Sequence, residues 1–86
     1  MRARRRPLAD RVDRDGEAVV LVGRQVVRLS PLAVTLLDGC ADWTVDQELA
    51  DALVARFGPP LEGPTPLEST RAALRDLEAQ GLVDCD

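Results

Sequence analysis

The stretch from Glu17 to Pro31, EAVVLV-GR-QVVRL-SP, decides the fold. Residues 17–22 are rich in valine, which favours a β-strand. Gly23-Arg24 separates this run from a second one at Gln25–Leu29. A Gly-X pair between two such runs is typical of a two-residue hairpin, because glycine accepts the first position of a type II′ turn. The stretch therefore predicts a β-hairpin, and Ser30-Pro31 then begins a helix.

The short turn fixes how the two predicted strands pair. Val22 faces Gln25, so Val20 faces Val27 and Val19 faces Arg28. Because successive side chains point to opposite faces of a sheet, each face of the hairpin can be read off directly. One face carries Ala18, Val20, Val22, Val27 and Leu29, and the other carries Val19, Leu21, Val26 and Arg28. Both are mostly apolar, so two interpretations stay open: a strand pair covered on both sides, or one that keeps an apolar surface for a partner.

The residues before the hairpin extend the predicted sheet. Leu8–Val12 is a candidate first strand, and Asp13–Gly16 is a turn in which Gly16 is free to take a positive φ. Residues 1–7 hold four arginines and are predicted to form a flexible, solvated arm. The remaining residues, 8–86, are predicted to fold as one domain.

Two helices are predicted directly after the hairpin. The first is short and apolar over Leu32–Leu37, and Gly39 ends it. The second begins at Thr44–Gln47, which fits a capping box, and ends at Gly58-Pro59-Pro60. Between these signals Val45, Leu49, Ala52, Leu53 and Phe57 repeat at helical spacing.

A third helix is predicted from Thr65-Pro66 to about Gln80, where Gly81 occupies the position of a left-handed cap. Leu67, Thr70, Leu74 and Leu77 share one face of it, and Arg71, Arg75 and Glu78 follow one border of that face. This border is either a solvated flank of ion pairs or a charged lip beside a groove, and spacing alone favours the flank.

The order of elements predicts an α+β, winged-helix-like fold of two to three antiparallel N-terminal strands followed by three helices.

The composition argues against an enzyme. The 86 residues include no histidine, the commonest general base and metal ligand, and all eleven basic residues are arginine. Cys40 therefore has no histidine to deprotonate it, and Cys40 and Cys85 are too far apart in sequence to form a C-x-x-C zinc motif. Carboxylates such as Asp46, Glu48 and Asp51 are expected at exposed helix positions. We expect a binding module with no catalytic residue, no metal site and no cofactor.

The sequence also allows predictions of the protein's location and of whether it binds nucleic acid. The chain has no apolar run of about 18–20 residues and no apolar secretory signal, so a cytoplasmic protein without membrane contact is expected.

A winged-helix DNA-binding regulator is the alternative function, from another class of protein. In that case the second helix would present Asp46, Gln47, Glu48 and Asp51 to DNA against only Arg56. Acidic side chains oppose phosphate binding, so a protein or peptide partner ranks above nucleic acid.

Several motifs in sequence order are similar to the PqqD-like family. They are Asp15–Val22 with Gly23-Arg24, then Val27–Ala33, Leu37-Asp38-Gly39, Trp43–Asp46 and the closing Leu77–Val83. The resemblance covers about residues 15–83, and the departures from it are the arginine-rich start and the proline-rich stretch from Gly58 to Pro66.

The resemblance implies a recognition element that captures the leader segment of a ribosomally made precursor peptide. The leader would add as a strand along the third strand of the family fold, in the groove against the third helix. By position, the implied peptide-binding residues are Gln25, Val26, Val27, Arg28 and Leu29 on the strand and Thr70, Arg71, Leu74, Arg75 and Glu78 on the helix. The implied partners are the leader peptide and a leader-cleaving protease or another modifying enzyme. A lasso peptide pathway is favoured, and a peptide chaperone for a radical enzyme is the alternative.

Overall fold

The predicted hairpin is present in the computed structural model, which describes residues 1–86. Strand β3 (Glu17–Val22) pairs antiparallel with β4 (Gln25–Leu29), and Val22 lies opposite Gln25. The whole register follows as predicted, through Val20 opposite Val27 to Ala18 opposite Leu29. Gly23 has a φ of 58°, the left-handed value that the first position of the turn requires.

A third strand completes this sheet. Strand β2 (Asp10–Arg14) pairs with the other edge of β3, which gives the order β2-β3-β4. The strand is shifted by two residues from the predicted Leu8–Val12. It continues to Arg14 because the connecting turn is confined to Asp15 and Gly16, both with positive φ. On β2, Arg11 hydrogen-bonds through Nε to Asp13 at 2.6 Å and through Nη2 to Asp38 at 3.1 Å, and thereby fixes the sheet to the first helix.

The prediction of a flexible arm over residues 1–7 is wrong. Strand β1 (Arg2–Arg5) is the middle strand of a second, small sheet, between β5 (Thr44–Val45) and β6 (Val83–Cys85). Ala3 is fully buried, whereas its neighbours Arg2 and Arg4 project outward and lie over the Trp43 ring, 5.4 and 4.8 Å from its centroid. The alternation of small and charged residues therefore serves a half-buried strand, with cation–π contacts on its outer side.

Three helices follow, as predicted. They are α1 (Pro31–Gly39), α2 (Asp46–Phe57) and α3 (Pro66–Ala79). The Ser30 hydroxyl accepts the N–H of Ala33 and caps α1, and the Thr65 hydroxyl caps α3 in the same way. At the end of α3, Gly81 has a φ of 80° and the Leu82 N–H donates to the Leu77 carbonyl at 2.9 Å, which is the predicted left-handed cap.

The start of α2 differs from the prediction. Thr44 does not cap the helix, because it belongs to β5 and its hydroxyl donates to the Asp42 carbonyl at 2.8 Å. The helix begins at Asp46, and this rotates its buried face. The buried residues are Asp46, Leu49, Ala50 and Leu53, whereas Val45, Ala52 and Phe57 are exposed. The expectation that Asp46 is an exposed charge is therefore wrong.

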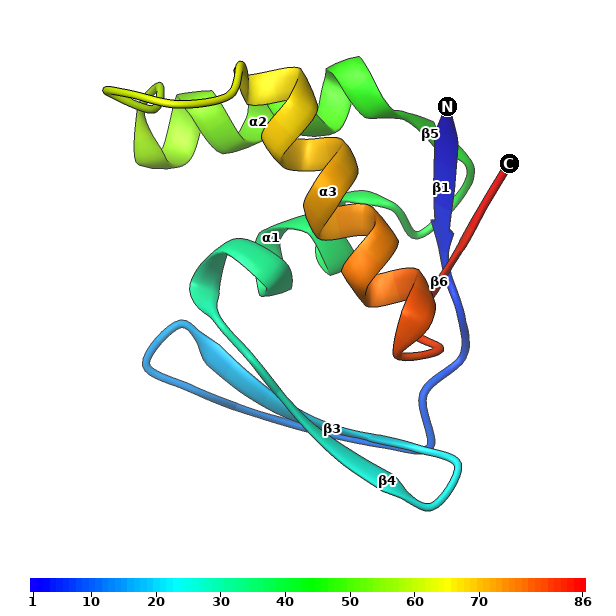
Figure 1. Cartoon of the computed structure of the whole chain (residues 1–86). Helices are drawn as coiled ribbons and strands as arrows, with labels where there is room; N and C mark the ends of the chain where they lie inside the picture. The colour runs from blue at the N-terminus through cyan, green and yellow to red at the C-terminus, as the bar shows by residue number, and fades with distance from the viewer.

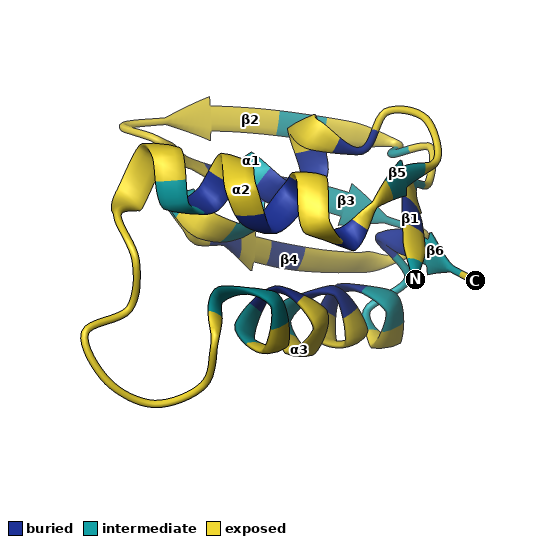
Figure 2. Cartoon of the chain, turned by 90° about the horizontal axis from the view of Figure 1, so that it is seen from above, coloured by how far each residue is buried: buried dark blue, intermediate teal, exposed yellow.

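The helices lie together on one side of the β2-β3-β4 sheet (Figure 1). The inner face of the sheet packs Val20, Val27 and Leu29 against Leu36 and Leu37 of α1 and the buried leucines of the other helices, and Figure 2 shows this burial along α3. The architecture is α+β, with N-terminal antiparallel strands before three helices, and it is compatible with the winged-helix-like class. None of the helices has the length and the apolar character needed to cross a membrane.

Candidate functional site

Strand β4 presents a free edge. It is the last strand of the order β2-β3-β4, so only β3 bonds to it. Hydrogen-bonded and non-bonded pairs alternate along an antiparallel ladder, and the two-residue turn makes Val22–Gln25 a bonded pair. The main chains of Gln25, Val27 and Leu29 therefore point to β3. Those of Val26 and Arg28 point away from it, with their N–H and C=O groups open to another strand.

A groove lies beside this edge, between β4 and α3. Its volume is about 300 Å³, and it also touches the start of α1. The lining residues bring the last two residues of β4 together with the C-terminal half of α3. The lining residues are Arg28, Leu29, Ser30, Leu32, Ala33, Ala73, Asp76, Leu77 and Gln80. The buried Leu77 forms the floor, and the charged Arg28 and Asp76 lie at opposite walls. An open main-chain edge beside a groove is an arrangement to which an extended peptide can add as a strand.

The five residues predicted on β4 are divided between the two sides of the strand. Val27 and Leu29 are buried and face the core, and Leu29 also lines the groove. Gln25, Val26 and Arg28 are exposed, with Val26 retaining 68% of its accessible surface. The structure thus places Val26 and Arg28 at the edge where a strand would add, and Val27 and Leu29 beneath it.

The residues predicted on α3 are not at the groove. Arg71, Arg75 and Glu78 lie about 140–160° around the helix from Ala73, which lines it. Leu74 is fully buried and does not line the groove. These three side chains border the opposite side of the buried face and do not line the groove, so their part in peptide binding stays a prediction.

Arg71 is instead part of a structural ion pair. Its Nε donates to Asp46 Oδ2 at 2.6 Å, and the Asp46 side chain is only 5% exposed. The hydrogen bond from Arg71 holds the pKa of Asp46 below its usual value. This pair ties the first turn of α2 to α3, so Arg71 has a partner without any ligand. Arg75 likewise pairs with Glu78, 3.2 Å away on the next turn, in agreement with the interpretation of this border as a solvated flank.

Thr70 lies within the buried face of α3 and not on either of its borders. It is 1% exposed and its hydroxyl has no hydrogen-bond partner. It lines a separate recess between the end of α2 and the start of α3. Of the five residues predicted on α3, none lines the groove beside β4.

Sequence reasoning missed the residues of α3 that do line the groove. They are Ala73, Asp76, Leu77 and Gln80, of which only Leu77 had been singled out, as part of the buried face. Their spacing of three, four and seven residues from Ala73 is a helical stripe. That stripe is visible in the sequence, but nothing in the sequence shows that β4 lies next to it.

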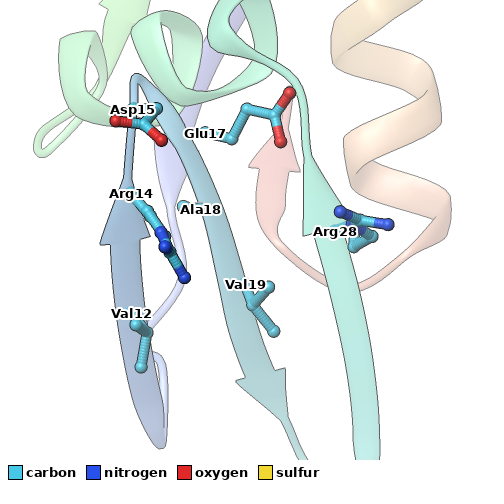
Figure 3. Close-up of a pocket in the computed structure, with 7 residues that line it drawn as sticks. All are labelled: Val12, Arg14, Asp15, Glu17, Ala18, Val19 and Arg28. Carbon is cyan, nitrogen blue, oxygen red and sulfur yellow. The ribbon is translucent and has the colours of Figure 1, made fainter.

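A second recess opens on the outer face of the sheet. It has a volume of about 320 Å³ and is lined by Val12, Arg14, Asp15, Glu17, Ala18, Val19 and Arg28. Figure 3 shows Arg14 of β2 and Arg28 of β4 on either side of Val19. Arg28 thus lines both the groove and this outer recess. Together with the exposed Val12 and Val26, this face is the uncovered apolar surface that the hairpin pattern left open.

The two cysteines carry no activated thiol. Burial raises the pKa of Cys40, and burial likewise raises the pKa of Cys85. A thiol in such surroundings stays protonated near neutral pH, whereas nucleophilic cysteines need a lowered pKa.

The β4 side of the molecule offers hydrogen-bonding main chain, an apolar floor and two opposite charges. Comparisons of the chain with protein-family models, with curated proteins and with solved structures each return no match.

Proposed function

We propose that this protein is a non-catalytic module that captures the leader segment of a ribosomally synthesised precursor peptide by strand addition. The observation that carries the proposal is the free edge of β4 beside the groove against α3. The similarity of residues 15–83 to the PqqD-like pattern supports the same assignment, because that family is expected to bind leaders at this place in its fold.

The added strand would bond to β4 through Val26 and Arg28. Each offers one N–H and one C=O to the free edge, so two residues provide up to four main-chain bonds. Such bonds give affinity without regard to sequence, and side-chain pockets on alternate positions provide selectivity.

The side chains of the bound peptide would alternate between two environments. Those that point inward enter the groove, where Ala33, Ala73 and Leu77 favour apolar groups. Those that point outward lie beside the exposed Val26 and Arg28, and Figure 3 shows Arg28 on this outer face. An acidic or apolar residue suits the outward positions, since Arg28 has no ion-pair partner within the protein.

The bound peptide would then be presented to a separate enzyme. A leader-cleaving protease of a lasso peptide pathway is the partner we favour, and a radical enzyme that uses a peptide chaperone is the alternative. A DNA-binding role has less support, because the exposed side of α2 carries Gln47, Glu48 and Asp51. These side chains would be placed near phosphates, which bind to basic residues.

Titration calorimetry tests the proposal. The probes are synthetic peptides that cover the N-terminal part of each short open reading frame beside the gene, with a scrambled version of each as control. We expect one of them to bind with micromolar affinity or better, and its scrambled version to release no heat. If no peptide from the neighbouring frames binds while circular dichroism shows a folded protein, the proposed function is wrong.

A further inference from the structure

Two charged side chains at the groove beside β4 have no partner within the protein. Most arginines of the chain are ion-paired, and Arg28 is the one unpaired arginine that lines the groove. Asp76 is the one acidic residue that lines it, and Asp76 forms no ion pair either, with Arg28 or with any other residue. Because Arg28 comes from β4 and Asp76 from α3, the groove has one free charge of each sign on facing walls.

Asp76 lies at a position of α3 that is unfavourable for a carboxylate. It belongs to the last turn of the helix, close to the negative end of the helix dipole. Glu78 is in the same turn, but its charge is compensated by Arg75, whose Nη1 lies 3.2 Å from the Glu78 carboxylate. Asp76 has no such compensation within the chain. A positively charged group of a ligand in the groove would provide it.

Arg28 likewise has no acid directly beside it. Glu17 lines the same outer recess, and Figure 3 shows Glu17 and Arg28 on the neighbouring strands β3 and β4. The residue directly opposite Arg28 on β3 is Val19, so Glu17 is at a diagonal position, where side chains lie further apart. On the other side of Arg28 the edge of β4 is free. An acid on an added strand would therefore be nearer to Arg28 than Glu17 is.

Strand addition would place the two free charges against neighbouring residues of the bound peptide. Arg28 points to the outer face, so the peptide residue opposite Arg28 also points outward, with about 5 Å between the two Cβ atoms. The adjacent peptide residue, opposite Leu29, points inward to the groove that Leu29 and Asp76 line. An acid at the first of these positions and a base at the second would each meet the opposite charge.

We propose that the site selects a peptide in which an acidic and a basic residue are adjacent, with the acidic residue against Arg28 and the basic residue against Asp76. This inference rests on the proposed function and names the class of peptide that the site takes. Opposite charges on neighbouring strands attract and like charges repel. An added strand also displaces water from both side chains, which is costly for a charge without a partner.

The order of the two residues reports the direction of the added strand. In an antiparallel strand the residue opposite Leu29 precedes the residue opposite Arg28, so the base comes first. In a parallel strand the acid comes first.

Charge exchange between protein and peptide tests the proposal. The probe is the synthetic peptide that binds the wild type in calorimetry, with versions in which each acidic residue becomes lysine or each basic residue becomes glutamate. These are titrated into the wild type, Arg28→Glu and Asp76→Lys. We expect one acid-to-lysine version to lose about tenfold affinity for the wild type and to recover to within about threefold on Arg28→Glu. The version with the adjacent base changed to glutamate should recover in the same way on Asp76→Lys.

Arg24→Glu and Glu62→Lys are the matched controls, because both residues are exposed, have no ion-pair partner and do not line the groove. Neither control should recover any peptide version, and circular dichroism checks that all four variants are folded. A charge on an edge strand can also serve only to discourage chance pairing with other chains. In that case Arg28→Glu would change the affinity for every version alike, without recovery, and the proposal would be overturned.

The outcomes distinguish this inference from the proposed function. If a peptide binds at β4 and no charge exchange recovers its affinity, or the two recovering residues are not adjacent, the charge preference is wrong and the proposed function stands. If no peptide binds at all, the proposed function fails and this inference fails with it.

Discussion

Replacing Val26 by proline tests strand addition most directly. Val26 is 68% exposed, and its N–H points to the free side of β4. Proline removes that donor and places its ring where an added strand would lie, but it breaks no bond to β3. The same change at Val27 would be uninformative, because the Val27 N–H belongs to the β3–β4 ladder and its side chain is buried.

The magnitude follows from the number of main-chain bonds at this edge. Val26 and Arg28 offer up to four such bonds, each with a net contribution of about 1 kcal/mol. Val26→Pro deletes one and leaves a peptide carbonyl unpaired against the edge, which costs about 1 kcal/mol more. A total of about 2 kcal/mol corresponds to a loss of affinity of about 30-fold. The free energy of unfolding should change by about 1 kcal/mol or less, since the position is exposed.

The assay is titration calorimetry with the peptide that binds the wild type, together with urea denaturation of each variant. Val26→Thr is the matched control, because it retains a branched side chain and the N–H. We expect Val26→Thr to bind within about threefold of the wild type. Strand addition at β4 is refuted if folded Val26→Pro binds as tightly as the wild type, or if Val26→Thr loses as much affinity as the proline variant.

Four further predictions concern α3 and the Arg71–Asp46 ion pair. Ala73→Phe should fill the groove and lower peptide affinity tenfold or more in calorimetry with little change in melting temperature, and unchanged affinity would place the peptide elsewhere. Arg75→Glu should leave peptide affinity within about twofold, whereas Arg71→Ala should destabilise the fold by about 1.5 kcal/mol, or roughly 6–12 °C in melting temperature. Because Arg71 lowers the pKa of Asp46, the stabilisation from this carboxylate is present above its unfolded pKa of about 3.9 and is lost as pH falls through the lower folded value. Urea denaturation should therefore find Asp46→Asn less stable than the wild type at pH 7, by a margin that shrinks as the pH is lowered below about 3.9, and a difference independent of pH would contradict this role.

The hairpin and the caps of the first and third helices were predictable because short segments determine them. Gly23 sets the turn, the turn sets the register, and Ser30 and Thr65 cap the helices that follow them. Strand β1 was not predictable in this way. Its partners β5 and β6 lie about 40 and 80 residues further along the chain, and an arginine-rich run of four residues has no strand pattern apart from the small Ala3.

The candidate site was only half predictable for a related reason. The edge strand Gln25–Leu29 follows from the hairpin, so its residues were placed correctly. On α3 the spacing of Leu74 and Leu77 shows which face is buried, but each buried face has two borders. Periodicity does not tell which border faces β4, and the arginines predicted at the site lie on the border that does not line the groove.

The two borders of α3 have opposite physical requirements, and the side chains on each match them. The border toward α2 must hold two helices together, and Arg71 does this by reaching the buried carboxylate of Asp46. If a strand adds to β4 as proposed, it lies about 5 Å from β4 and close to α3, so the border toward β4 must leave room for it. Ala73 is short, and it stands at the middle of that border. A long side chain there would fill the groove that the free edge of β4 requires. The absence of arginine from this side of α3 is therefore as informative as its presence on the other.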